Sequence, residues 1–565
     1  MNNTRRLWLA LGALLIVSFS VLLWSGAQIQ RNAAPMPERV VAEGGATVYT
    51  RADIERGRQV WQSMGGMQLG SIWGHGAYVA PDWSADWLHR EAVAILDRWA
   101  RAEHAGSSFT QLPPDAQAAL QGRLQPMMRR NTYDPANGTI TLSQDRAAAV
   151  AQVAQHYIGL FGNDPATAEL REAYAMKDDT VPDAEHRKAL SAFFWWTAWA
   201  ATTERPRAAA AVLAPEHPAM QARQVTYTNN WPGEPLVGNA PPASTWVWSA
   251  FSVLFLIAGI GLLGWHHAVT RDEDPEHRLP ASDPLAALKV TPSMRATAKY
   301  FWLVLVLFLV QILLGAMTAH YQVEGQQAYG YALADVLPYS ITRTWHTQLA
   351  VLWIATAWLG TGLYIAPAMS GHEPRWQRAG VNVLFACLLV IVVGAFTGQW
   401  FAVMQKLGLD YNFWFGHQGW EYADLGRFWQ IFLFIGLLLW LTLVGRALWP
   451  VLRGPASESK AIVGLLFLAT VAIGVFYASG LMWREHSHIS VVEYWRWWLV
   501  HLWVEGFFEV FATAVIALIF TRLGLLRTST AAVAVLFATI VFMTGGVLGT
   551  LHHLYFVGSP TAVVA

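Results

Sequence analysis

One long apolar run lies near the N-terminus, and eight more alternate with polar stretches from about residue 245 onward. Each run approaches the roughly 20 residues that an α-helix needs to cross a bilayer. They lie near the N-terminus, from Leu7 to Trp24, and at about residues 245–266, 298–319, 344–367, 378–401, 428–449, 461–480, 492–520 and 530–551. Between residues 28 and 243, charges and prolines alternate with amphipathic helical patterns, which is typical of a water-soluble domain. The pattern predicts an all-α polytopic membrane protein with one large soluble domain.

Lysine and arginine divide the connecting loops into two classes. Four loops are rich in these residues, and the intervening loops carry few. The basic loops contain Arg271, Arg278, Lys289 and Arg295, then Arg375 and Arg378, then Arg446, Arg453 and Lys460, and finally Arg522 and Arg527. The positive-inside rule places these four loops in the cytoplasm and the soluble domain outside.

The N-terminal run is preceded by Arg5 and Arg6, and no small-residue cleavage motif follows it. We therefore expect an uncleaved signal anchor whose N-terminus lies in the cytoplasm. The chain is expected to divide into this transmembrane helix over 1–27, a periplasmic domain over 28–243 and a transmembrane bundle over 244–565. Residues 232–242 are interpreted as a linker that leads back to the membrane.

Composition narrows the chemistry that the chain can perform. Hydrophobic residues make up 54% of it and the formal net charge is zero, which fits a membrane protein and gives no sign of nucleic-acid binding. The single cysteine, Cys387, excludes an intrachain disulfide, a cysteine-rich metal site and a C-x-x-C-H haem attachment motif. The 18 histidines include several within or beside apolar runs, and these need an explanation.

The stretch EYWRWWLVHLWVEGFFEV at 493–510 places charged groups inside an apolar run. His501, Glu505 and Glu509 follow one another at four-residue steps, which puts them on one face of a helix. A charged group at this depth costs about 2.5–3.5 kcal/mol on insertion scales unless it meets a partner, water or a metal. Two interpretations stand: a hydrogen-bonded polar triplet, or a metal-ligand pair of His501 and Glu505 with Glu509 handling protons.

Other histidines fall at the same predicted depth. His346 lies at the outer start of its run, and His552 and His553 lie at the outer end of the last run, level with His501. Adjacent histidines on a helix point about 100° apart, so both reach one metal only if the metal lies close against the helix or the helix ends there. The pair at 266–267 is at a cytoplasmic end, where exposure explains it. Three imidazoles and a carboxylate suit non-haem iron better than copper.

Three strings of the sequence resemble one family. HLWVEGFFE, GTLHHLYFVGSP and TRTWH are similar to strings of the single-chain, quinol-dependent nitric oxide reductases of the haem-copper oxidase superfamily. The resemblance implies a haem-copper oxidase-like helix bundle in which His501, His552 and His553 bind non-haem iron. It implies that Glu505 is the carboxylate neighbour or ligand of this iron and that Glu509 helps to deliver protons.

The same resemblance implies further cofactors. His346 would be one axial ligand of a low-spin haem b, and a calcium ion would lie between the haem propionates. The calcium ligands would be Glu421, the Gly76 carbonyl and the Tyr78 hydroxyl, because oxygen donors suit a hard cation. Taken alone, Glu421 is only a loop carboxylate. His486 and His488 alternate as ligands do, but they are interpreted as solvated residues of an exposed loop.

The outer domain bears on the electron donor. GSIWGHGAYVAPDW at 70–83 resembles the segment that follows the haem attachment site in the cytochrome c subunit of the two-subunit enzymes. The attachment positions fall on GMQLG at 66–70, so we expect a cytochrome c-like fold that lacks haem c, and no cytochrome c subunit. Electrons would come from quinol, which the family holds at the positions of His320 and Glu324. Without the resemblance, such an interfacial pair is more often unremarkable.

The implied function is quinol-dependent reduction of nitric oxide to nitrous oxide and water at a haem b3/non-haem iron centre, with electrons passing through haem b. Oxygen-reducing relatives carry tyrosine where Glu505 stands, which disfavours a quinol-linked oxygen reductase. The family continues beyond Ala565 and supplies there the histidine pair that ligates haem b3 and haem b. We therefore expect a bundle that is incomplete at its C-terminus, and a non-catalytic truncated membrane protein stays an alternative. The expected location is the lipid bilayer of the bacterial inner membrane, and a homodimer is left open.

Overall fold

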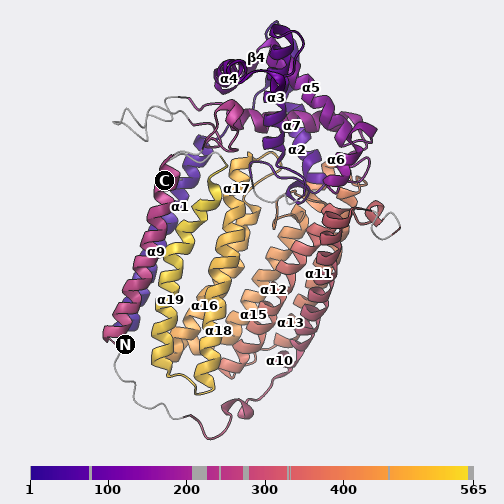
Figure 1. The fold of residues 1–565 in the computed structure, drawn as a ribbon. Coiled ribbons are helices and arrows are strands. Elements are labelled where there is room, and N and C mark those ends of the chain that lie inside the picture. Colours follow the sequence, from indigo (N-terminus) through magenta and orange to yellow (C-terminus); the bar gives the residue numbers. More distant parts are fainter. Residues whose placement is uncertain are drawn as a thin grey trace.

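Long helices run side by side through most of the molecule, and a smaller domain covers one end of them (Figure 1). The computed structural model describes residues 2–74, 79–206, 225–240, 243–270, 279–326, 330, 333–455 and 458–557. Within this part of the chain, eight helices are long and apolar enough to cross a membrane, and Ser249–Trp265 forms a shorter apolar helix. All nine apolar runs are thus confirmed as helices, and the fold is that of a polytopic helical membrane protein.

The bundle is built from helices at both ends of the sequence. Its helices are α1 (Asn2–Arg31), α9 (Ala243–Thr270), α10 (Pro292–Ala296), α11 (Ala298–Glu324), α12 (Tyr339–Ser370), α13 (Gln377–Val403), α14 (Leu409–Phe415), α15 (Arg427–Arg453), α16 (Glu458–Phe476), α17 (Ile489–Trp497), α18 (Glu509–Arg522) and α19 (Thr528–Gly549). Helix α1 packs along α19, and α11 packs along α12. The first helix of the chain is therefore part of the bundle.

Large apolar side chains cover the outside of the bundle. Phe255 of α9, Trp302 of α11 and Val393 of α13 are 72%, 69% and 67% exposed. Such a surface would be unfavourable in water but suits contact with lipid, where a helix satisfies its own backbone hydrogen bonds. The exposed surface therefore fits a bundle that is surrounded by a bilayer.

The connections between helices alternate between the two ends of the bundle, as the lysine and arginine pattern predicts. The connections from α12 to α13 and from α18 to α19 carry basic residues and lie at the end away from the smaller domain (Figure 1). The N-terminal end of α1 lies at this same end. The smaller domain and the basic loops are therefore on opposite sides of the bundle.

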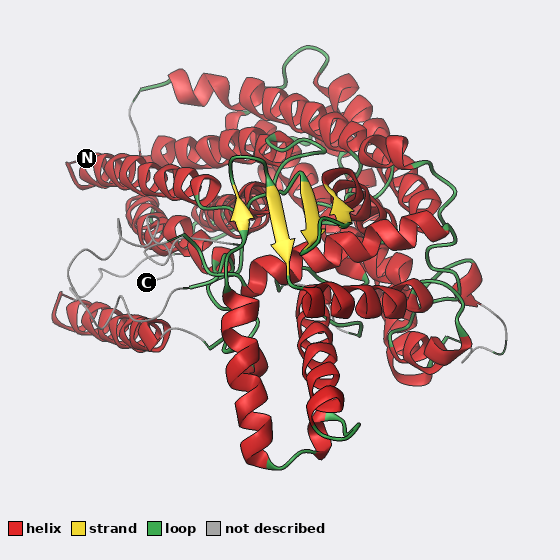
Figure 2. Ribbon diagram, turned by 90° about the horizontal axis from the view of Figure 1, so that it is seen from above, coloured by secondary structure: helices red, strands yellow, loops and turns green. Residues whose placement is uncertain are grey.

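The outer domain combines helices with one small sheet. Its helices are α2 (Arg51–Ser63), α3 (Trp83–Glu103), α4 (Pro114–Arg129), α5 (Gln144–Leu160), α6 (Ala168–Ala173) and α7 (Ala184–Thr202). Its strands are β1 (Arg39–Ala42), β2 (Thr47–Thr50), β3 (Tyr133–Asp134) and β4 (Thr139–Leu142), in the order β2-β1-β4-β3 (Figure 2). β1 is antiparallel to β2 and parallel to β4. The sequence did not predict this sheet, because strands of two to four residues are too short to show an alternating pattern.

Helix α7 forms the centre of the outer domain. From Ala189 to Thr202 every residue of this helix is buried, including Trp195, Trp196 and Trp199. Helix α2 approaches α7 closely at Gly57, where a Cβ atom would lie 2.0 Å from the carbonyl oxygen of Ala189. Glycine at this position therefore allows the two helices to pack backbone against backbone.

One expectation about a surface loop is wrong. His488 is not freely solvated: it is half-buried, caps the first turn of α17 and has Nε2 2.9 Å from the Ala34 carbonyl oxygen. Burial lowers the pKa of His488 to about 4. Residues 232–240 lead to α9 and contact the outer domain on the way, because Gln121 of α4 donates a hydrogen bond to the Pro235 carbonyl and Asn239 donates one to the Ala201 carbonyl. Both loops are fixed by tertiary contacts that have no sequence pattern.

The contact at Gly57 leads to a stability prediction. Gly57→Ala is expected to lower the free energy of unfolding by about 1–3 kcal/mol, because its methyl group would overlap the α7 backbone. Gly122→Ala is the matched control, since Gly122 lies inside helix α4 and a Cβ there would have open space. Thermal unfolding of the purified chain in detergent checks both variants. Equal stability of the two variants would contradict the prediction.

Candidate metal centre

His501 lies in a π-helix. Residues Trp498–Phe508 form this element, η8, between α17 and α18. Its hydrogen bonds join residue i to residue i+5, an uncommon arrangement that is frequent at functional sites. The sequence predicted one continuous α-helix here, and over these 11 residues that prediction is wrong. His501 is buried, and its Nε2 atom lies 2.9 Å from the carbonyl oxygen of Gly546 in α19.

His552 and His553 stand where helix α19 ends. The α-helix stops at Gly549, and Thr550–Leu554 continue as a 3₁₀ turn, η9. The rings of His552 and His553 have centroids 4.0 Å apart, and the His501 ring lies 5.4 Å and 5.2 Å from them. One side-chain nitrogen from each of the three lies within 4.8 Å of the others. The structure therefore brings together the three histidines that the sequence singled out.

The donor set determines which metals this cluster could hold. Three imidazoles are ligands that suit iron, copper and zinc. A ring N–H that donates to a backbone carbonyl, as Nε2 of His501 would to Gly546, fixes the orientation of a metal-binding histidine. Gly549 lies beside the cluster, and a Cβ atom there would come within 3.5 Å of His501 Nε2. The histidines present thus fit a transition-metal ion.

Trp497 supports the cluster from one side. Its ring stacks on His553 with centroids 3.6 Å apart and planes only 2° from parallel. The guanidinium of Arg496 lies 4.6 Å from the centroid of Trp497, and Trp497 Nε1 donates to Glu493 at 3.3 Å. Arg496 and Glu493 form a buried ion pair at 2.8 Å. Trp497 was not among the residues predicted for the site, although its position four residues before His501 was an available signal.

The outer domain contacts the segment that directly follows the histidine cluster. Asn229 donates through Nδ2 to the Tyr555 carbonyl at 2.9 Å, and the Tyr555 hydroxyl donates to the Asn229 carbonyl at 3.2 Å. Trp231 packs against Phe556 with centroids 5.2 Å apart. These contacts fix the chain directly after His553. Sequence reasoning missed them, because contacts between residues more than 300 positions apart leave no local signal.

Of the two glutamates that follow His501, only the Glu509 side chain lies within the described residues. Glu509 is the first residue of α18 and is exposed on the surface of the bundle. The Glu505 side chain lies outside the described residues, although its backbone is part of η8. Glu509 therefore does not share the buried position of His501, although the four-residue spacing predicted one face of one helix for both.

His346 lies in α12 and is oriented by α11. Its Nδ1 atom is 2.9 Å from the Gln311 carbonyl oxygen, and its ring packs on Gly315, where a Cβ atom would lie 2.7 Å from Cε1. A ring fixed in this way through Nδ1 is suited to bind a metal through Nε2. These contacts thus hold the His346 imidazole in one orientation.

Glu421 joins two of the helices that carry candidate ligands. Its carboxylate pairs with Arg343 of α12 at 2.8 Å, and its carbonyl accepts a hydrogen bond from Arg496 of α17 at 3.0 Å. All three residues are at most 8% exposed, so Glu421 is not the ordinary loop carboxylate that it resembles in the sequence. The other two expected calcium ligands, Gly76 and Tyr78, lie outside the described residues.

Two further titratable groups are buried beside Glu421. His417 Nε2 lies 3.0 Å from the Thr344 hydroxyl and 3.8 Å from Asp424, which accepts hydrogen bonds from Gln68 and Gln348. Burial lowers the pKa of His417 to about 3 and raises the pKa of Asp424 to about 7. Burial therefore favours the neutral form of both groups, which form a polar layer between the outer domain and the bundle.

His320 and Glu324 form a pair at the outer end of α11. His320 Nδ1 lies 2.8 Å from the Glu324 carboxylate, and their side chains are 44% and 54% exposed. The predicted proximity is thus present, at an accessible surface of the bundle.

Comparison with known proteins matches two parts of the chain to family models. Residues 37–233 match the model of the cytochrome c-like domain of the nitric oxide reductase B subunit, and residues 295–565 match "Cytochrome C and Quinol oxidase polypeptide I". The chain is also 26% identical over 272 residues to the B subunit of nitric oxide reductase from Stutzerimonas stutzeri, which covers 47% of this chain and 54% of that protein. The chain thus spans about half the length of this curated relative.

The matched regions contain the features described above. The first covers the outer domain, and the second contains His346, Glu421 and the three clustered histidines. The chain therefore belongs to the haem-copper oxidase family, and within this family it is similar to the B subunit of nitric oxide reductase.

Proposed function

We propose that this chain takes part in the quinol-dependent reduction of nitric oxide to nitrous oxide and water. The observation that carries the proposal is the convergence of His501, His552 and His553 at the outer end of the bundle. The similarity to a protein of nitric oxide reductase supports this substrate over oxygen, as does glutamate at position 505. The reaction centre would be a haem b3 and non-haem iron pair.

The three histidines would hold the iron, with Glu505 as its carboxylate neighbour or ligand. When bound, ferrous iron would supply a Lewis-acidic and redox-active centre that positions nitric oxide. The chain itself provides the orientation, because Trp497 fixes the plane of His553 and the Gly546 carbonyl fixes His501. Glu509 is proposed to assist proton delivery.

His346 is proposed as an axial ligand of haem b, with its Nδ1 held by the Gln311 carbonyl. Glu421 is proposed as a calcium ligand together with Gly76 and Tyr78. The buried position of Glu421 beside Arg343 supports a role in binding charged groups at this end of the bundle. If haem propionates lay beside Glu421, the positive charge of Arg343 would partly neutralise these carboxylates.

Quinol is the proposed electron donor, and His320 with Glu324 would hold its head group and accept its protons. Their 2.8 Å contact and their exposure at the bundle surface support this assignment. We propose that the outer domain carries no haem c. No cysteine lies at 66–70, and a Cβ atom at Gly66 would lie 2.2 Å from the backbone of Gly419.

We further propose that the protein lies in a bacterial inner membrane with the outer domain in the periplasm. The three-part division into 1–27, 28–243 and 244–565 belongs to this proposal. No cytochrome c subunit is needed if quinol is the donor, and a homodimer is one assembly that this arrangement allows. The rival functions are a non-catalytic membrane protein and a quinol-linked oxygen reductase.

The function is tested by quinol-driven consumption of nitric oxide, followed with an electrode on the purified chain after addition of haem b. Glu505→Ala is expected to abolish consumption and to leave the haem b absorption spectrum unchanged, because Glu505 is assigned to the iron and not to the haem. Glu169→Ala, at an exposed position of α6, is the matched control and should consume nitric oxide normally. Near-normal turnover by Glu505→Ala would remove its assigned role.

The same assay separates the rival functions. Oxygen uptake in excess of nitric oxide uptake would favour the oxygen reductase. Consumption of neither gas, by a chain that still binds iron, would favour the non-catalytic alternative.

Iron binding is tested independently of turnover. His501→Ala or His552→Ala is expected to weaken ferrous iron binding by more than about 100-fold, since even the loss of a contact behind a ligand costs 10–100-fold. His486→Ala is the control, because the His486 side chain is 62% exposed. Metal analysis after dialysis against graded iron concentrations gives the affinities. If all three variants keep the same affinity, the three histidines are not the site.

Asn229 is expected to position the cluster without touching the metal. Asn229→Ala removes the hydrogen bond to the Tyr555 carbonyl and should weaken iron binding about tenfold. Asn163→Ala, which removes an exposed contact to Asp179 elsewhere in the outer domain, should not. The thermal stability of both variants is measured in parallel. An unchanged iron affinity in Asn229→Ala would show that the outer domain does not hold the cluster.

A further inference from the structure

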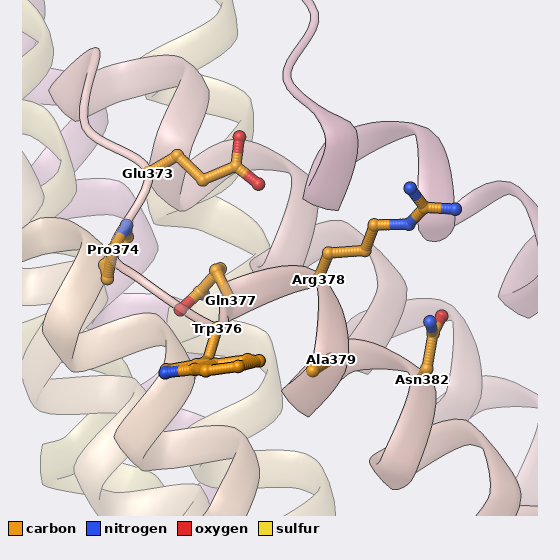
Figure 3. Close-up of a pocket in the computed structure, with 7 residues that line it drawn as sticks. All are labelled: Glu373, Pro374, Trp376, Gln377, Arg378, Ala379 and Asn382. Carbon is orange, nitrogen blue, oxygen red and sulfur yellow. The ribbon is translucent and has the colours of Figure 1, made fainter.

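A polar hollow lies at the end of the bundle away from the outer domain. Its volume is about 490 Å³, and it is lined by the loop before α13 and by the first turns of α13, including Glu373, Trp376, Gln377, Arg378 and Asn382. Figure 3 shows the Glu373 carboxylate and the Arg378 guanidinium extending to the same side, with the Trp376 indole below them in this view. Nothing in the proposed redox function uses these residues.

Two cations lie close together at the hollow. Lys299 of α11 donates a hydrogen bond to Asn382 Oδ1, and Arg378 stands four residues before Asn382 in α13, so both cations lie on the same side of this helix. Among the described residues, neither cation forms an ion pair with a carboxylate within 4.0 Å. Glu373 accepts a hydrogen bond from the Ser293 backbone at 2.8 Å instead. Two adjacent cations without a counter-ion form a site for an anion.

One residue that lines the hollow also carries a buried acceptor without a partner. Gln377 is 1% exposed and donates through Nε2 to the Leu443 carbonyl at 2.9 Å. Its Oε1 atom is buried and has no hydrogen-bond partner within the part of the chain that the structure describes. A buried acceptor without a partner is costly, by about 1–3 kcal/mol, so a donor from a ligand would relieve it. The expected ligand is therefore an anion that also carries a hydrogen-bond donor.

The surface beside the hollow fits an apolar continuation of that ligand. Trp302 and Leu305 of α11 are 69% and 52% exposed, and Val383 and Val390 of α13 are 54% and 53% exposed. These residues continue along the two helices away from the polar end. Trp376, 69% exposed, stands at the level where tryptophan commonly marks the boundary between lipid and water.

We propose that this hollow binds the headgroup of a phospholipid. The phosphodiester would pair with Arg378 and Lys299, the hydroxyl or ammonium of the headgroup would donate to Gln377 Oε1, and the acyl chains would lie along α11 and α13. Basic pockets at the cytoplasmic ends of transmembrane helices commonly bind headgroups in this way. The ligand class is a phospholipid with a donor in its headgroup, such as phosphatidylglycerol or phosphatidylethanolamine.

The proposal is tested on the delipidated full chain by native mass spectrometry with graded amounts of defined lipids. The wild-type chain should retain one phosphatidylglycerol or phosphatidylethanolamine more tightly than phosphatidylcholine, whose headgroup has no donor. The double variant K299A/R378A should weaken this binding at least about tenfold, which corresponds to about 1.4 kcal/mol. The control K289A/R453A removes two basic residues that neither line the hollow nor bond to a residue that lines it, as Lys299 does to Asn382, and it should bind as the wild-type chain does.

Three results would overturn the proposal. One is equal affinity of the two double variants for the lipid. A second is equal binding of phosphatidylcholine, which would mean that the donor to Gln377 is not part of recognition. The third is complete displacement of the lipid by millimolar inorganic phosphate, which would identify a free phosphate site. A Q377M chain that no longer distinguishes phosphatidylethanolamine from phosphatidylcholine would support the assigned role of Oε1.

Discussion

The buried contacts of Glu421 hold the outer end of the bundle together. Glu421 pairs with Arg343, which lies three positions before His346. Its carbonyl accepts a hydrogen bond from Arg496, which lies five positions before His501. The two helices that carry these histidines are thereby fixed to the same point. Removing one partner of a buried ion pair typically costs about 3–5 kcal/mol, because the other charge is left without compensation. The relative placement of the candidate haem and metal ligands depends on this loop.

Much of the architecture could be predicted from the sequence because a bilayer imposes simple rules. Apolar runs of sufficient length must be helices, and basic residues gather on one side, so the nine helices and their alternation followed directly. The three clustered histidines could also be predicted, since their depth follows from the topology. His552 and His553 converge because α19 ends at Gly549, which was one of two conditions that the sequence left open.

The remaining features depend on long-range contacts that no local pattern encodes. The π-helix around His501 contains no proline and has the composition of an ordinary apolar helix, so nothing marked it in advance. The stacking of Trp497 on His553 joins residues 56 positions apart in sequence. The hydrogen bond between Asn229 and Tyr555 joins residues 326 positions apart. The polar loop around His488 indicated an exposed side chain, but the outer domain packs against this one residue through Ala34 and Trp196.

The attachment of the outer domain has a mechanical consequence. Arg58 binds the carbonyls of Glu485 and Ser487, Gln62 binds that of Gln418, and Gln326 binds Glu172, so separate loops of the bundle are all tied to it. A tethered carrier that swings between two docking positions would have to break these bonds together at each cycle. The outer domain is therefore fixed on the bundle, and electron transfer into the bundle would have to occur without movement of this domain.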